Sequence, residues 1–233
     1  MAFSVIANTG GGGNGASVTS GGINTTGANV AIVGVVKWRD GSGINAAVGH
    51  FTDSNANTWN KLTNWTTANG LQCVLAWSVL SSVGAGHTFT YNDGGSESFP
   101  SLAVLALSGA HASPFDQQSG TNGGSGTSAQ PGSITAVSND QVFVTIFLID
   151  SPGSNGNSTI DSGFTISNQT NFSVGQWVGS ALAYKIQTTA GAENPTWTPP
   201  GSATRNCAMA TFLSASGTGV AGYLGRRLLS GVG

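Results

Sequence analysis

Short hydrophobic runs recur along the chain, separated by clusters of Gly, Asn, Ser and Asp, and this spacing is typical of β-strands joined by turns. Almost no window repeats apolar residues at the i, i+3, i+4, i+7 spacing of an amphipathic helix. The clearest predicted strands cover residues 29–38, 71–80, 87–92, 101–109, 141–149, 180–189 and 207–213. The pattern therefore predicts an all-β chain.

The predicted strands are of two kinds. Segment 141–149 is apolar on both faces, with Val142, Val144, Ile146 and Leu148 facing one way and Phe143, Phe147 and Ile149 the other. Segment 161–170 alternates, as a strand with one solvent-exposed face does, whereas a strand covered on both sides does not alternate. Central strands of the first kind and edge strands of the second favour a sandwich of two antiparallel sheets.

One domain is expected. The Gly/Ser-rich stretch 119–132 divides the chain near its middle, but neither half shows a complete core pattern, so we predict a surface loop there. At this size a jelly roll of the concanavalin-like type is the predicted sandwich. An up-and-down barrel is the alternative, although it should alternate more uniformly. The domain is expected to cover residues 1–214, followed by a flexible linker and C-terminal anchoring tail at 215–233.

The predicted tail combines apolar and basic residues after the linker-like sequence SASGTG. We expect its apolar residues to dock on a partner and its arginines to fix the orientation on an acidic surface. A frayed terminus is the alternative. The predicted anchoring residues are Tyr223, Leu224, Arg226, Arg227, Leu228 and Leu229.

Charge is scarce in this chain. Only 7% of its 233 residues are charged and the net charge is −2, whereas 36 residues are Gly and 39% are hydrophobic. A chain this hydrophobic is not expected to be disordered, and it has no basic stripe for nucleic acid. No apolar run reaches membrane-spanning length. Neither a nucleic acid nor a membrane is therefore a predicted partner. The start MAFSVIANTG lacks the regions of a signal peptide, so synthesis in a cytoplasm is expected.

Catalytic side chains are few and scattered. A glycoside hydrolase usually needs two carboxylates beside the scissile bond, and Glu97 and Glu193, the only glutamates, both stand beside turns. The histidines His50, His87 and His111 have no metal-ligand spacing. The sequence therefore predicts a protein that is not an enzyme.

The two cysteines, Cys73 and Cys207, are too few for a disulfide framework. Each stands in an apolar, strand-like run, so buried thiols are predicted. Whether the two pair with each other stays open.

The stretch DSNANTWNKL places Asp53, Asn55 and Asn57 at alternate positions, as calcium loops do at their start. An EF-hand loop would continue with Gly at its sixth position and Glu at its twelfth, where this chain has Thr58 and Asn64. Asp and Asn also form turns by bonding their own backbone. A turn between strands is therefore predicted and no cofactor, with calcium at these three residues as the alternative.

Three of the six tryptophans stand in polar surroundings, namely Trp65, Trp177 and Trp197. A flat aromatic ring beside amides and hydroxyls suits stacking on the apolar face of a sugar, so these three are candidate glycan-binding residues. Core packing and subunit contacts are the alternatives. Trp38 and Trp77 continue apolar strands and are expected in the core.

The order of the motifs DSNANTW, GHTFTY, FPSLAVLALSGA with SPFD, DSGFTI and ALAYKIQTTAGAENPTW resembles that in a group of β-sandwich proteins. Members are encoded in tailed bacteriophages and environmental bacteria, and the likeness covers roughly residues 3 to 213. The resemblance implies a lectin-like jelly roll that is a structural or adhesive part of the particle. It carries over no catalytic residue.

From this resemblance we expect a non-enzymatic protein on the virion surface, either a head decoration or a tail fibre. Expected partners are capsid or tail proteins, further copies of the chain, and surface glycans. The lack of a signal peptide suits a phage product made in the host cytoplasm and released by lysis. A carbohydrate-binding module that is not part of a virion is the alternative.

Overall fold

The computed structural model describes residues 1–13, 15–38, 50–94, 99–150, 157–170 and 178–216. Regular structure in these segments is nearly all β-strand, and every strand pair is antiparallel. The all-β prediction is therefore confirmed.

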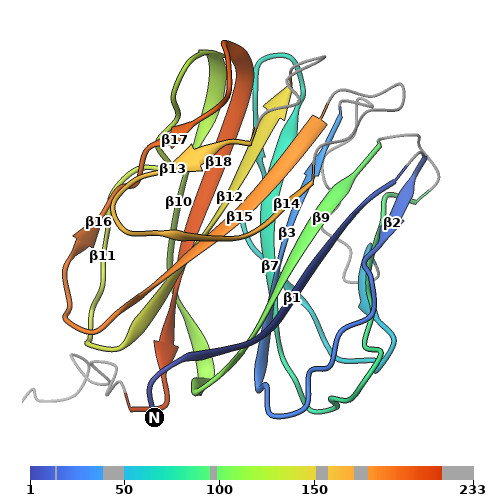
Figure 1. Ribbon diagram of the computed structural model, residues 1–233, viewed down its shortest axis with the longest axis vertical. Coiled ribbons are helices and arrows are strands. Elements are labelled where there is room, and N and C mark those ends of the chain that lie inside the picture. Colours follow the sequence, from blue (N-terminus) through green and yellow to red (C-terminus); the bar gives the residue numbers. More distant parts are fainter. Residues whose placement is uncertain (14, 39–49, 95–98, 151–156, 171–177, 217–233) are drawn as a thin grey trace, which may run out of the picture.

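Two large sheets face each other (Figure 1). The first sheet has the strand order β1 (Ser4–Gly12), β9 (Ser101–Ser108), β3 (Val30–Lys37), β7 (Gln72–Val79) and β5 (Asn60–Lys61), and β6 (Trp65–Thr66) also pairs with β7. The second sheet has the order β10 (Ala110–Gly126), β18 (Ala203–Ser214), β12 (Gln141–Asp150), β15 (Val178–Gln187) and β14 (Thr165–Thr170).

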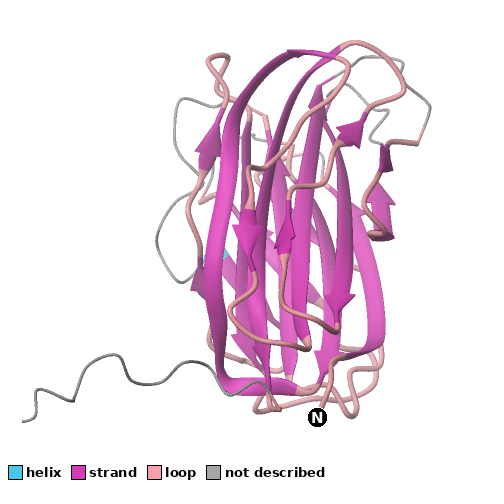
Figure 2. Ribbon diagram, turned by 90° about the vertical axis from the view of Figure 1, so that its left-hand side faces the viewer, coloured by secondary structure: helices cyan, strands magenta, loops and turns pink. Residues whose placement is uncertain are grey.

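Small sheets cover the outer faces of both large sheets. The first is covered by β2 (Ser17–Thr19), β8 (Phe89–Asn92) and β4 (Phe51–Asp53). The second is covered by two pairs, β11 (Ile134–Thr135) with β16 (Ala192–Glu193) and β13 (Thr159–Ile160) with β17 (Trp197–Thr198). Figure 2 shows short strands lying in front of the long ones.

This layering produces three apolar cores. The central core lies between the large sheets and includes Ile32 and Val144. The first outer core lies under β2, β8 and β4 and includes Val33, and the second outer core lies under the remaining small strands and includes Phe143. Because each central strand is buried on both faces, its side chains are apolar on both. The two predicted faces of segment 141–149 point into the central and second outer cores, which confirms that prediction.

The second half of the chain repeats the topology of the first. Strands β1, β3, β7 and β9 form the order β1-β9-β3-β7, and β10, β12, β15 and β18 form the matching order β10-β18-β12-β15. The registers match as well: Val33 lies between Ala76 and Val104, and Thr145 lies between Ala183 and Met209. Each half therefore builds one large sheet together with its own cover.

Hydrogen bonds of the covers repeat too. The backbone N–H of Thr88 bonds the side chain of Ser54, whose own N–H bonds the carbonyl of Thr88. Thr196 and Asp161 exchange the same two bonds in the second half. In the two strand orders β9 is equivalent to β18, and β7 is equivalent to β15. Between the sheets β9 packs on β15 and β18 packs on β7, as an approximate twofold relation between the halves requires. At its centre Gly34 faces Ile146, its own counterpart, and a Cβ at Gly34 would lie 2.6 Å from Ile146 Cδ1.

The two-sheet sandwich is thus present, but jelly-roll order is not confirmed. Each large sheet comes from one half of the chain, and the halves meet at Gly109 between β9 and β10. In a jelly roll two Greek keys are shared between the sheets. The strand pattern predicted the sheets but carried no information on which strands pair.

The surface loop predicted at 119–132 is wrong in its first part, because β10 continues to Gly126 and pairs with β18 up to that residue, with a register shift between Thr121 and Gly124. Gly in a strand often marks a bulge or a close approach of other groups. At Gly120 the approach is close, since a Cβ there would lie 2.4 Å from the ring of Trp65 on β6. Gly120 therefore marks close packing rather than a turn.

The described chain begins and ends at the same end of the sandwich (Figure 1). Ala215 N donates to Gly109 O. Gly109 has a φ of +87°, and a Cβ at this position would lie 2.2 Å from Ala2 O. The opposite end holds the last residues of β3 and β12 and the first residues of β7 and β15.

Candidate functional site

Asp53 organises the turn that follows β4. Its Oδ1 accepts hydrogen bonds from the backbone of Asn55 (2.9 Å) and from the backbone and side chain of Asn57, and its Oδ2 accepts one from Trp59 Nε1 (2.8 Å). Trp59 is buried edge-on against Phe89. The stretch therefore forms the predicted turn and anchors it in the first outer core.

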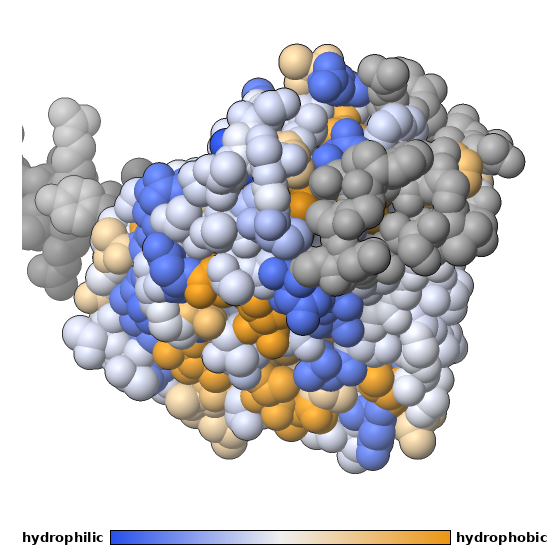
Figure 3. Space-filling view, turned by 45° about the horizontal axis from the view of Figure 1, so that its top comes forward, coloured by the Kyte–Doolittle hydropathy of each residue, from blue (hydrophilic) through white to orange (hydrophobic). Residues whose placement is uncertain are grey.

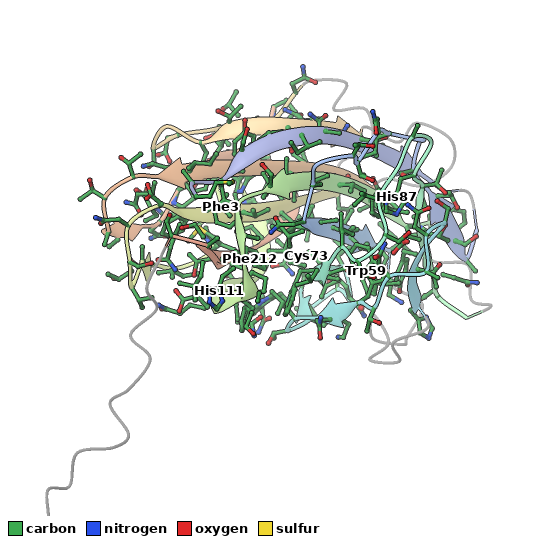
Figure 4. The ribbon with its side chains drawn as sticks, turned by 90° about the horizontal axis from the view of Figure 1, so that it is seen from below. Phe3, Trp59, Cys73, His87, His111 and Phe212 are labelled. Atoms are coloured by element: carbon green, nitrogen blue, oxygen red, sulfur yellow. The ribbon has the colours of Figure 1, made fainter. Side chains whose placement is uncertain are left out.

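His87 joins this turn to another segment. Its Nε2 lies 3.0 Å from Asp53 Oδ1, and its Nδ1 lies 2.9 Å from Thr25 Oγ1. Burial raises the pKa of Asp53, but the hydrogen bonds from His87, Trp59 and the turn backbone outweigh it, so this pKa is lowered overall. Figure 4 shows His87 and Trp59 in the same region, well away from His111.

The order Thr25, His87, Asp53 resembles a catalytic triad, in which an accessible hydroxyl attacks the substrate. Here the hydroxyl is not accessible, because Thr25 is 0% and His87 1% exposed. Thr25 Oγ1 also accepts a 3.0 Å hydrogen bond from Gly84 N. The three side chains therefore tie the segment before β3, the β4 turn and the start of β8 together.

The side-chain oxygens of Asp53 and Asn57, two of the three proposed calcium ligands, already face hydrogen-bond donors. Asn57 Oδ1 accepts bonds from Ser81 N, Ser81 Oγ and Ser82 N, at 2.9 to 3.2 Å. Asn55 uses its side-chain nitrogen on Ser82 O. A calcium ion needs oxygen lone pairs directed at it, so this geometry favours the turn interpretation. Among the described residues, no group of three or more His, Cys, Asp or Glu could hold a metal ion.

Trp65 lies on the seam where β6 meets β10 of the other sheet. Its ring is half-buried over Gly120, and its carbonyl accepts a 2.8 Å bond from Asn206 Nδ2. Next to it, Thr66 N donates to Asn122 Oδ1. We call Trp65, Gly120 and Asn122 the Trp65 seam. The seam places an aromatic ring close to an amide side chain, and it joins residues far apart in sequence.

Trp197 is not a surface residue, and its assignment as a glycan-binding residue is wrong. The side chain is 0% exposed. Its ring stacks on Phe147 with centroids 5.1 Å apart, and its Nε1 donates to Thr145 Oγ1 at 3.1 Å. Polar neighbours in the sequence misled the prediction, because the short strand β17 turns the ring into the second outer core. Trp38 and Trp77 pack against the central core, as predicted.

Several other candidates are not brought together. Trp177, Glu97 and the six predicted anchoring residues (Tyr223, Leu224, Arg226, Arg227, Leu228 and Leu229) lie outside the described residues. Glu193 binds Lys185 Nζ at 2.6 Å and Gln187 Nε2 at 3.0 Å, a pairing that fixes its carboxylate on the outer face of the second sheet.

Both cysteines are free and buried, as predicted for thiols. Cys73 belongs to the central core and Cys207 to the second outer core. Burial raises the pKa of Cys207 to about 12, and burial together with the nearby Cys207 raises the pKa of Cys73. Neither is a reactive thiolate at neutral pH.

In the described segments, no helix has the length and apolar character needed to cross a membrane. No family model, curated protein or solved structure matches the chain. Any function must therefore be argued from the residues and their geometry.

Proposed function

We propose that this chain is a non-enzymatic structural or adhesive protein on the surface of a tailed-phage virion, as a head decoration or fibre component. The observation that carries the proposal is that both faces of both large sheets are covered. The polar groups most like catalytic ones, at Thr25, His87 and Asp53, are sealed inside. What the described part offers to partners is therefore its edges, its loops and a sparsely charged surface.

The surface supports the same role. With 7% charged residues, the exterior consists mainly of hydroxyls, amides and backbone. Figure 3 shows one face on which hydrophilic and near-neutral residues are interleaved with smaller hydrophobic patches. Sparse charge also makes a coat less dependent on ionic strength, because salt screens charged contacts most strongly.

The placement of the chain ends suits display on a particle. Residues 1–3 and 214–216 lie at one end of the sandwich. If 217–233 binds a capsid or tail protein, that end faces the particle and the ends of β3 and β12 face outward. In this arrangement the tail provides attachment and further copies of the chain pack side by side.

Deletion of residues 217–233 is expected to leave folding intact and abolish attachment. The deletion spares the hydrogen bond from Ala215 N to Gly109 O, which closes the last described strand against the junction of the halves. The measurement is cosedimentation with particles of a tailed phage that encodes the chain, prepared so that the particles lack this protein. Purified full-length protein and purified truncated protein are each added to these particles. Circular dichroism and light scattering serve as controls for fold and oligomeric state.

A second variant separates charge from length. Reversing both arginines, Arg226→Glu and Arg227→Glu, should weaken attachment while keeping the tail. Cosedimentation of the truncated protein at the full-length level would contradict the anchoring proposal.

The Trp65 seam favours a second candidate function, glycan binding, either on the virion or as an independent carbohydrate-binding module. Binding on a glycan array should become roughly 2- to 12-fold weaker in Trp65→Ala, because an aromatic contact contributes roughly 0.5–1.5 kcal/mol. The buried substitution Trp197→Phe is the control and should leave binding unchanged. The array is run with calcium and then with chelator, and unchanged binding in Trp65→Ala would exclude this seam.

A further inference from the structure

Lys37 and Asp93 form a buried pair at the edge of the first outer core. Lys37 ends β3, Asp93 follows β8, and Nζ lies 2.7 Å from Oδ2. The two side chains are 0% and 1% exposed. Tyr91, two residues before Asp93, donates its hydroxyl hydrogen to the other carboxylate oxygen, Oδ1.

The repeat of the fold shows that this position does not require a charge. Lys37 follows Val36, which lies between Cys73 and Ser101. In the second sheet Ile149 follows Leu148, which lies between Ser180 and Asn206. These registers make Ile149 the counterpart of Lys37, and Ile149 is buried in the second outer core.

A buried ion pair is commonly no more stabilising than apolar side chains of similar size, because both charges lose their hydration. The stability of an ion pair alone therefore gives no reason for Lys37 in one half of the chain where the other half has Ile149.

We propose that Lys37 Nζ and Asp93 Cγ become joined by an amide bond, a covalent cross-link that forms within the folded chain. In the balanced step, a proton passes from the ammonium to the carboxylate and gives a neutral amine and a carboxylic acid. Nζ then attacks Cγ, the Cγ–Oδ2 bond breaks, and Oδ2 leaves as water with the acid proton and one proton of the amine. No oxidant, reductant or further reactant is needed.

Two features of the site favour this step. The fold holds the two groups in contact, which replaces a bimolecular encounter by an intramolecular one. The Tyr91 hydroxyl is directed at Oδ1, the oxygen on which negative charge develops during attack. In the product Tyr91 donates to the amide carbonyl instead.

The bond would join the small covering sheet of β2, β8 and β4 covalently to the central strand β3. It would close a loop between residues 56 positions apart, and cross-links that close long loops restrict the unfolded chain most. No disulfide does this, since both cysteines are free.

The test is the intact mass of the purified, denatured full-length protein. The expected mass is lower than that of the sequence by one water molecule. Tandem mass spectrometry after trypsin digestion should find a branched peptide joining Lys37 to Asp93, with no cleavage after Lys37. The variants Lys37→Met and Asp93→Ala should each have the full mass calculated from their own sequence, with no water missing.

Lys185 and Glu193 provide an internal control. Their atoms approach equally closely, at 2.6 Å, but the lysine side chain is 26% exposed. We expect no bond there, so exactly one water should be lost, and Lys185→Met should keep that loss.

Two results would overturn the cross-link. One is a wild-type mass equal to that of the sequence. The other is a missing water confined to a linear peptide, as a succinimide at Asp93–Gly94 would give, with normal trypsin cleavage after Lys37.

Discussion

Replacement of Asp53 by alanine is expected to lower the free energy of unfolding at pH 7 by about 3–5 kcal/mol. The substitution leaves the indole N–H of Trp59 and the turn N–H groups of Asn55 and Asn57 without their acceptor. It also removes one of the two side-chain partners of His87, the other being Thr25. Each buried donor left unsatisfied is costly. Urea denaturation followed by circular dichroism measures the loss.

The effect of Asp53 should depend on pH. Its pKa is lower in the folded protein than the ordinary value near 3.9 expected after unfolding, so the folded state favours the charged form. The contribution to stability is therefore fully present above about pH 5 and is lost as pH falls through the folded pKa. The difference between wild type and Asp53→Ala should shrink on acidification.

Asp161→Ala is the matched control, because Asp161 stands in the repeated turn of the second half. Its pKa is also lowered, chiefly by the hydrogen bond from Thr196 N, but the residue is exposed. Its loss should cost far less. Equal destabilisation by the two substitutions would contradict the role assigned to Asp53.

Trp197→Ala is expected to destabilise the protein by about 3–5 kcal/mol, the usual cost of removing a large buried aromatic side chain. The substitution opens a cavity beside Phe147 and leaves Thr145 Oγ1 without its indole donor. Thermal and urea unfolding followed by circular dichroism measure this, since the substitution itself changes the tryptophan fluorescence.

Two further variants test whether the burial of Trp197 is the cause of the expected loss of stability. Trp197→Phe keeps an aromatic ring against Phe147 and should cost clearly less. Trp65→Ala removes a half-buried ring and should also cost less than Trp197→Ala. If Trp65→Ala were the more destabilising of the two, the burial of Trp197 would be in question.

Local pattern was enough to predict what a long central strand buries. In segment 141–149 the alternating branched and aromatic residues predicted two buried faces, and the structure has a core on each side. The turn after Asp53 was predictable for the same reason, since Asp and Asn side chains bond backbone groups a few residues away.

Contacts between distant segments could not be predicted in this way. His87 lies 34 residues from Asp53, and the two meet only because β4 pairs with β8. Lys37 at the end of an apolar strand looks solvent-exposed until the cover above it is known. The prediction for Trp197 was wrong in the same direction, because the two-residue strand β17 shows no pattern that distinguishes its buried face.

The contact between Gly34 and Ile146 shows what a single chain permits and a symmetric dimer does not. A symmetric dimer of two half-length chains would also place two sheets of one strand order face to face. In such a dimer identical residues meet on the axis, so two glycines would leave a hole and two isoleucines would collide. A single chain escapes this constraint and sets a small residue against a large one. The same freedom allows a buried charge at Lys37 in one half and the apolar Ile149 at the equivalent position of the other.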